Sequence, residues 1–310
     1  MITVRGLDKS YRAVHAVRDL SFDVRPGVVT GFLGPNGAGK STALRLMLGL
    51  DHGRGDTRYD GVPMARIPRP ARVVGAVLDA TAVHPTRTAR NHLRMLAASA
   101  GIRSGRVDEV LDLVGLGDAG HRCPGAFSLG MGQRLGLAGA LLGDPAHLIL
   151  DEPANGLDPE GIHWLRALLR DLAAQGRCVL VSSHLLAEMA QLADDLVVIG
   201  RGRLILAGTV TDFVARFAPG VAVVRSPHAD RLAAVLAAAG VGPLTATPDG
   251  ALLVGGVDLV TVGEAAARHG LTLHELSWRA ASLEDAFLRA TGAMTDHRGG
   301  RAGARAGGPS

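Results

Sequence analysis

The segment GPNGAGKST, at residues 34–42, constrains the fold of this chain more than any other part of its sequence. It matches the complete P-loop pattern and stands between a strand-like run and a helical run, the setting that such a loop needs. Its glycines let the backbone curl so that successive N–H groups point inward at the positive end of a helix, where phosphate oxygens can bind. A glycine-rich turn without a function is a much weaker interpretation of a full match. The sequence therefore predicts a nucleotide-binding α/β domain.

Within this loop, Lys40 would reach the β- and γ-phosphates, and the hydroxyl of Ser41 would be a ligand of Mg²⁺. Lysine occurs elsewhere only at position 9, while arginine supplies the remaining basic side chains. The residues that we expect to bind the nucleotide here are Gly34, Pro35, Asn36, Gly37, Ala38, Gly39, Lys40, Ser41 and Thr42.

A second acidic segment, HLILDEP at residues 147–153, is an apolar strand that ends in two carboxylates. Adjacent residues at a strand end point in different directions, so Asp151 can hold Mg²⁺ while Glu152 acts on a water molecule. Taken alone, such a segment is explained equally well as an acidic turn at a strand end and as a catalytic site. Next to a P-loop, the catalytic interpretation is preferred.

Composition excludes several classes of protein. The chain has 310 residues, enough for roughly two domains, and 47% are apolar and 20% charged, as in globular proteins. Two cysteines provide neither a disulfide framework nor a metal cluster. No stretch approaches the ~18 uninterrupted apolar residues of a membrane span, and the first residues lack the pattern of a secretory signal. Of the net charge of +4, the tail 293–310 carries half, with three arginines against one aspartate, so the charge does not indicate nucleic-acid binding.

The order of apolar patterns predicts a largely parallel sheet with crossover helices in the first two thirds of the chain. After the break FAPG at residues 217–220, the pattern becomes β-α-β-β-α-β, a ferredoxin-like order. A last helix, SLEDAFLRATG, opens with Ser282 three residues before Asp285, which is a capping-box arrangement. The terminal segment after it has no apolar face, and we expect it to be flexible.

Three further motifs follow the P-loop in a fixed order: FSLGMGQR directly before the acidic strand, then NGLDPEG and VSSH after it. Together with the P-loop and LILDEP, this series resembles the nucleotide-binding domain of the ABC (ATP-binding cassette) ATPases. The resemblance implies an ATPase domain over 1–217, with a mixed sheet and a helical subdomain at about 85–135. A small α+β accessory domain at 220–292 and a flexible tail at 293–310 would complete the chain.

The resemblance also implies roles for single residues. Tyr11 matches the aromatic residue that stacks on adenine, and His184 matches the switch histidine that senses the γ-phosphate. Ser128 and Gly130 match the signature motif, which contacts ATP held by a second copy of the domain. Asp158 matches the loop that crosses the interface between the copies. Homodimerisation across two ATP sites is therefore expected.

The chain departs from the family pattern at two places. The signature of the family is Ser-Gly-Gly-Gln, whereas this chain has Ser128, Leu129, Gly130 and Met131. The family's glutamine that touches Mg²⁺ and couples to the membrane partner aligns with Asp79. An acid at position 79 can still face a metal.

As a whole, the chain is most similar to the drug-resistance branch typified by the daunorubicin and doxorubicin exporters of actinobacteria. Their ATPases have a small C-terminal domain that ends in a motif similar to LEDAFLRATG, at residues 283–292. Related operons also serve bacteriocins. This implies a peripheral ATPase at the cytoplasmic face of the membrane, which binds ATP and Mg²⁺ and drives export through a separate integral-membrane permease, with no nucleic-acid partner.

Two alternatives belong to other classes. A soluble ABC ATPase acting on ribosomes or chromosomes is disfavoured, because such proteins carry two cassettes or a long coiled coil between their two nucleotide-binding motifs. About 110 residues separate Lys40 from Asp151 here, without sustained heptads. A non-catalytic regulatory subunit would need a degraded site, yet the P-loop lysine, both carboxylates and His184 are present.

Overall fold

The computed structural model describes residues 1–78, 83–84, 86–218, 220–280 and 282–292. Two compact units make up the chain, Met1–Val210 and Thr211–Ser310, and helix α7 (Val210–Phe217) begins at the last residue of the first unit. In the described residues, no helix is both long enough and apolar enough to cross a membrane.

The first unit is built on a six-stranded sheet with the strand order β10-β9-β3-β8-β7-β6. Its central strands are parallel, and β10 pairs antiparallel with β9 through a tight turn at Arg201 and Gly202. The parallel strands are almost entirely buried, as expected where both faces are covered. The strands are β3 (Val29–Leu33), β6 (Val74–Val77), β7 (His147–Asp151), β8 (Cys178–Ser183), β9 (Asp195–Gly200) and β10 (Arg203–Thr209).

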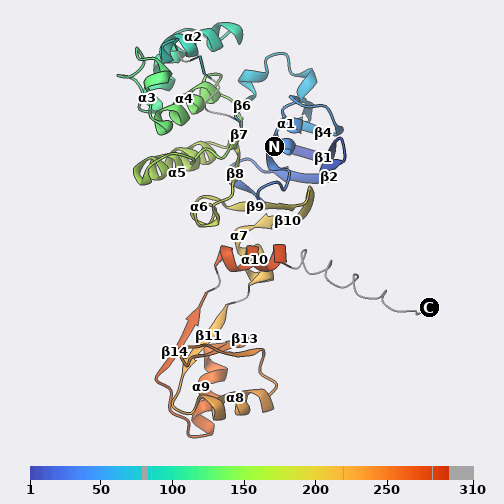
Figure 1. Ribbon diagram of the computed structural model, residues 1–310, viewed down its shortest axis with the longest axis vertical. Coiled ribbons are helices and arrows are strands. Elements are labelled where there is room, and N and C mark those ends of the chain that lie inside the picture. The colour runs from blue at the N-terminus through green and yellow to red at the C-terminus, as the bar shows by residue number, and fades with distance from the viewer. Residues whose placement is uncertain (79–82, 85, 219, 281, 293–310) are drawn as a thin grey trace, which may run out of the picture. The chain divides into compact units, whose positions relative to one another are not determined.

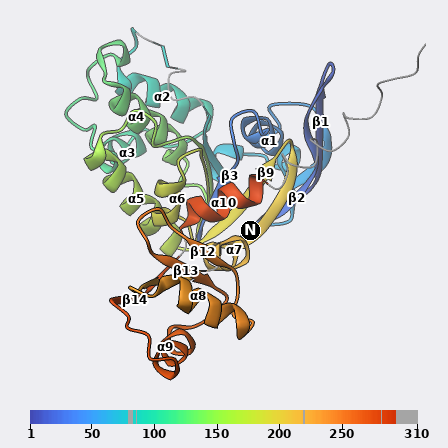
Figure 2. The ribbon, with the colours of Figure 1, turned by 60° about the horizontal axis from the view of Figure 1, so that its bottom comes forward.

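A second, antiparallel sheet has the order β2-β1-β4-β5, with β1 (Ile2–Tyr11), β2 (Val14–Val24), β4 (Arg54–Tyr59) and β5 (Val62–Pro63). Helix α1 (Lys40–Met47) lies between this sheet and the central sheet (Figure 2), and its Leu44 and Met47 are fully buried in the shared core. The strands near the N-terminus thus form a sheet of their own beside the mainly parallel sheet. This packing holds the P-loop, which directly precedes α1, between two sheets.

The other face of the central sheet is covered by helices (Figure 1). α5 (Pro159–Ala174) and α6 (Leu186–Leu192) lie next to the sheet, and α4 (Leu129–Leu141) lies against its edge strand β6. α2 (Ala89–Ser99) and α3 (Arg106–Leu113) pack on α4 and on each other. Short 3-10 turns complete the unit: η1 (Met64–Arg66), η2 (Pro70–Arg72) and η3 (Pro124–Ala126).

The second unit contains a four-stranded antiparallel sheet with the order β12-β13-β11-β14. Two helices cover one face around a core that includes Ala222, Leu232 and Val254. The elements are β11 (Val221–Arg225), α8 (Ala229–Ala238), β12 (Leu244–Ala246), β13 (Leu252–Gly255), α9 (Leu259–Arg268), β14 (Glu275–Arg279) and α10 (Leu283–Gly292). The predicted β-α-β-β-α-β order is confirmed, and so is the capping box, since Asp285 N–H donates to Ser282 Oγ at 3.1 Å. The tail 293–310 lies outside the described residues.

Candidate functional site

The P-loop runs from the end of β3 to the start of α1. Gly39, the N-cap of α1, has a φ of 101°, and a Cβ there would lie 2.3 Å from the carbonyl oxygen of Ala16. Only glycine fits this close approach. Asn36 and Ser41 are exposed at the mouth of the loop. The backbone thus has the open, glycine-dependent curl that a phosphate cradle requires.

Lys40 is the first residue of α1, and its side chain is 8% exposed. Its Nζ donates to the carbonyl oxygen of Gly34 at 2.7 Å, so the ammonium group points back across the loop. Burial lowers the pKa of Lys40, and the nearby charges of Glu152 and Asp151 oppose that effect. Lys40 Nζ lies 3.9 Å from Glu152 Oε1. The lysine of the P-loop and the predicted general base are therefore in one cluster.

The two acidic residues at the end of β7, Asp151 and Glu152, have different side-chain partners, as the alternation of side chains predicts. Asp151 accepts a hydrogen bond from the hydroxyl of Ser182 on the neighbouring strand β8. Glu152 has a φ of 49°, a left-handed conformation that is uncommon outside glycine, and its N–H donates to Ser182 Oγ at 2.9 Å. The Ser182 hydroxyl therefore bridges both acidic residues and supports the unusual turn between them.

His184 follows the end of β8 and is 41% exposed. Its Nδ1 lies 2.8 Å from Glu152 Oε2, within hydrogen-bond distance. The histidine and the glutamate thus form a pair at the carboxyl ends of adjacent parallel strands, the edge where α/β proteins bind their ligands. Such a pair can orient and deprotonate a water molecule.

Tyr11 lies at the end of β1, with 42% of its surface exposed. Its hydroxyl donates to Asp51, and the ammonium of Lys9 is 4.7 Å from the centre of its ring. The hydrogen bonds from Lys9 and from Tyr11 lower the pKa of Asp51 to about 2. These contacts anchor the polar end of Tyr11 and place the Lys9 ammonium against its partly exposed ring.

A second group of predicted residues surrounds the start of α4. Ser128 is the N-cap of α4, and its Oγ accepts from Met131 N–H at 3.2 Å. Asp158 caps α5 in the same way and accepts from Gly161 N–H at 2.8 Å. Gly130 lies beside the loop that precedes Asp158, because a Cβ at 130 would be 3.3 Å from the carbonyl oxygen of Gly156. Within the described residues, no hydrogen bond or ion pair joins this group to Lys40, Asp151 or Glu152.

The described residues include only some of the predicted ligands of Mg²⁺. No group of three or more His, Cys, Asp or Glu side chains that could hold an ion is found among the described residues. Asp79 lies outside them, so its role as a ligand stays a prediction. The donors that fit Mg²⁺ are the oxygens of Ser41 and Asp151. A donor set this small is usual for Mg²⁺, which is commonly bound by one or two carboxylates together with substrate phosphates.

Sequence reasoning did not identify Ser182 or Asp51. Ser182 stands in the VSSH segment beside His184, and its bond to Asp151 spans 31 residues. Asp51 has no motif around it. Both act through partners distant in sequence, which local patterns do not reveal.

Two known protein families match parts of this chain, and several known proteins are similar to its first unit. A family described as "ABC transporter" matches residues 17–155, and a domain of unknown function matches residues 220–284. The uncharacterized ABC transporter ATP-binding protein YhcH of Bacillus subtilis (strain 168) is 40% identical over 216 residues, which are 68% of this chain and 71% of that protein.

Two relatives have names that state a cargo. The bacitracin transport ATP-binding protein BcrA of Bacillus licheniformis is 40% identical, covering 66% of this chain and 68% of that protein. The lantibiotic transport ATP-binding protein SrtF of Streptococcus pyogenes is 35% identical, covering 66% and 90%. Among solved structures, an "ATP binding subunit of ABC transporter" has a TM-score of 0.64 and 30% identity, over 70% of this chain and 93% of that one.

Proposed function

The chain belongs to the ABC transporter ATP-binding proteins, and from that premise we propose that it powers the export of an antibiotic or other drug-like molecule through a separate membrane permease. It is an ATPase subunit of the ABC type. The observation that best supports the residue roles is the cluster of Lys40, Glu152 and His184 beside the P-loop. The cluster places a cation for phosphate, a base and a polar partner for that base at one edge of the sheet.

The residues present fit ATP and Mg²⁺. The backbone curl at Gly39 leaves no room for a side chain, and the oxygens of Ser41 and Asp151 are hard donors of the kind that Mg²⁺ prefers. When bound, Mg²⁺ would offset the negative charge that develops on the transferred phosphoryl group. Lys40 would exchange its bond to the Gly34 carbonyl for the β- and γ-phosphates. The Ser182 bridge would keep the Asp151 carboxylate in place throughout.

In the proposed reaction, Glu152 accepts the proton of the attacking water molecule. His184, at 2.8 Å from the Glu152 carboxylate, orients that carboxylate and contacts the γ-phosphate. With its left-handed backbone conformation, Glu152 has its Oε1 3.9 Å from Lys40 Nζ, beside the phosphate-binding lysine. The ring of Tyr11, anchored by Asp51, would stack on adenine.

The exposed residues Ser128 and Asp158, with Gly130, would complete the ATP site of a second copy of this chain. The Ser128 hydroxyl accepts from the Met131 N–H, so its own hydrogen remains available to a phosphate oxygen. The N-terminus of α4 adds a favourable dipole for an anion. Two copies would thus enclose two ATP molecules, and hydrolysis would let them separate.

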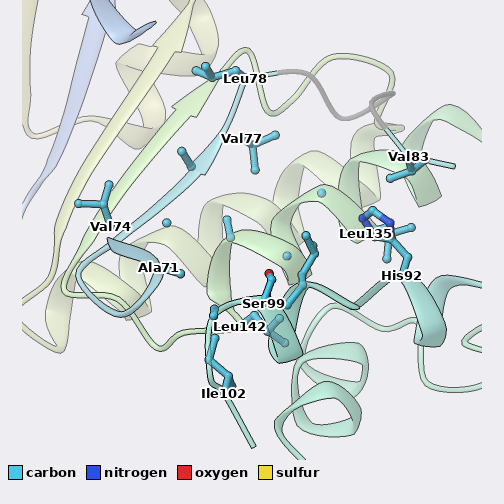
Figure 3. A pocket seen from close by; sticks show the side chains of 17 residues that line it. Ala71, Val74, Val77, Leu78, Val83, His92, Ser99, Ile102, Leu135 and Leu142 are labelled. Carbon is cyan, nitrogen blue, oxygen red and sulfur yellow. Dashed lines mark hydrogen bonds between the residues drawn. The ribbon is translucent and has the colours of Figure 1, made fainter. Parts of the chain in front are cut away.

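The permease would contact a groove of about 380 Å³ between β6, α2 and α4. Figure 3 shows Val77, His92 and Leu135 among the side chains that line it. Burial lowers the pKa of His92, so this side chain is neutral near pH 7 and adds no charge to the mostly apolar lining. We assign the groove to an apolar cytoplasmic segment of the permease. Contact there would hold the chain at the cytoplasmic face of the membrane.

The cargo class follows from the named relatives, one associated with bacitracin transport and one with lantibiotic transport. The drug-resistance branch suggested by the sequence agrees with export of such compounds.

The test is affinity purification of the tagged chain from membranes in MgATP, with the wild type and a Glu152→Gln variant in parallel. We expect an integral-membrane protein to copurify with both. The variant should retain ATP in a dimer and hydrolyse it about 10²–10⁴-fold more slowly, because a general base typically contributes that factor.

Glu264→Gln is the matched control, since Glu264 is exposed on α9 in the other unit and pairs with Arg268. It should hydrolyse ATP at the normal rate. Normal hydrolysis by Glu152→Gln would remove Glu152 from its role. Recovery of ribosomes or other soluble complexes without a membrane protein would contradict export and favour the soluble alternative.

A further inference from the structure

Leu129 stands where the family signature has glycine, and its surroundings give this departure a structural meaning. It is the first residue of α4, directly after the capping Ser128, and 56% of its surface is exposed. It lies on the backbone of Gly156, in the loop between β7 and α5.

The contact between Leu129 and Gly156 is close. A Cβ at position 156 would lie 2.1 Å from Leu129 Cδ2 and 2.3 Å from its Cγ, so the leucine occupies the space that any side chain at 156 would need. Gly156 also has a φ of 78°, which favours glycine. Next along α4, a Cβ at Gly130 would be 3.3 Å from Leu157 Cδ2. The start of α4 and the 156–157 segment therefore pack as one surface.

A second contact fastens α4 one turn later. The guanidinium of Arg134 lies 4.1 Å from the centre of the Trp164 ring on α5, and Arg134 Nη1 donates to the carbonyl oxygen of Val114 at 3.0 Å. Arginine stacked on an aromatic ring is a favourable contact. With α4 held at Arg134, the packing of Leu129 on Gly156 contributes to the position of the first turn, which carries Ser128 and Gly130.

We propose that Leu129 is a positioning residue for ATP binding across the dimer, holding Ser128 and Gly130 in register with the loop at Gly156 so that both segments meet the second copy together. This inference rests on the proposed two-copy site. Its physical basis is that the loop and the helix start are separate segments of the chain, and the Leu129 side chain packs directly on the loop at Gly156. Glycine at 129 would remove that contact.

The test compares Leu129→Gly with Leu129→Met and with the wild type. We expect Leu129→Gly to raise the KM for MgATP roughly tenfold and to weaken ATP-dependent dimerisation in the Glu152→Gln background by a similar factor, as the loss of a half-buried leucine contact would do. The affinity of the single chain for ADP should not change, because the P-loop is untouched. Leu129→Met, which conserves volume, should restore most of the KM.

The matched control is Leu113→Ala, an exposed leucine at the end of α3, which should leave the KM and dimerisation unchanged. If the wild type dimerises with ATP and Leu129→Gly has the same KM and the same dimerisation, Leu129 has no positioning role. The proposed function would still stand in that case. If the wild type hydrolyses ATP without dimerising, the two-copy site fails and this inference fails with it.

Discussion

Single residues carry the chemistry of this protein through partners that are far away in sequence. Ser182 joins Asp151 to the backbone of Glu152, and Asp51 anchors Tyr11. None of these supporting groups would contact a phosphate or adenine in the proposed site. They hold Asp151, Glu152 and Tyr11, the residues assigned to Mg²⁺, water and adenine. We therefore expect the loss of a supporting group to shift these side chains before it weakens nucleotide binding.

At the same scale, His147 makes stability depend on pH. Its side chain is 1% exposed, with Nε2 2.9 Å from Asp60 Oδ2. Burial lowers the pKa of His147 below its usual 6.5, and the charge of Asp60 opposes this only partly. The folded chain therefore keeps His147 neutral in a range where the unfolded chain binds a proton. The free energy of unfolding should fall as the pH drops below about 6.5, by at most ~1.4 kcal/mol per pH unit from this group.

Urea unfolding at pH 7.5 and pH 5.5, for the wild type and for His147→Gln, measures this contribution. We expect the variant to lose part of the decrease in stability between the two values. The comparison cancels the contribution of His92, whose pKa burial also lowers. Equal decreases in the two proteins would show that His147 does not titrate differently in the folded state.

At the scale of elements, caps decide where the helices begin. The family resemblance implies a helical subdomain from about residue 85, and α2, the first long helix after that point, begins at Ala89, after Thr88. Thr88 Oγ1 accepts from Asn91 N–H at 3.3 Å, which satisfies one free donor of the first turn. Helix α2 supplies one wall of the groove assigned to the permease, so its start affects that surface too.

We expect Thr88→Ala to destabilise the first unit by about 1 kcal/mol, because a capping hydrogen bond is lost. Thr88→Ser keeps the hydroxyl and should lose much less. Thermal unfolding of the two variants beside the wild type provides the measurement. Equal melting temperatures for Thr88→Ala and Thr88→Ser would rule out a capping contribution.

At the scale of the whole molecule, the chain has separate hydrophobic cores in its two units. The core of the second unit includes Leu232 on α8, which is fully buried. The buried residues of this core all come from the segment 222–271, so we expect the second unit to unfold in a transition of its own. Leu232→Ala should destabilise the second unit by about 2–5 kcal/mol and leave the unit with the P-loop unaffected.

Calorimetry with and without MgATP distinguishes the transitions, because bound nucleotide raises only the transition of the unit that holds it. The matched control is Val260→Ala on α9, which is 67% exposed and should change little. If Leu232→Ala lowers the nucleotide-sensitive transition by the same amount, the units do not unfold independently.

Much of this protein could be predicted from local patterns. Contiguous segments of the sequence encode the P-loop and the paired carboxylates of Asp151 and Glu152. They also encode the β-α-β-β-α-β order of the second unit. Their chemistry depends on residue type and on spacing along one strand or helix, which a sequence displays directly. The same patterns carry the resemblance to the ABC ATPases.

Other properties depend on segments that meet only after folding. The antiparallel sheet of the N-terminal strands, the bridge from Ser182 to Asp151 and the packing of Leu129 on Gly156 join residues on different elements. Nothing in the local pattern around Leu129 indicates which loop it covers, because that is set by how α4 and α5 pack together. Such pairs are determined by the packing of the whole first unit. Many weak contacts together stabilise one arrangement of its elements, and local sequence patterns do not contain that information.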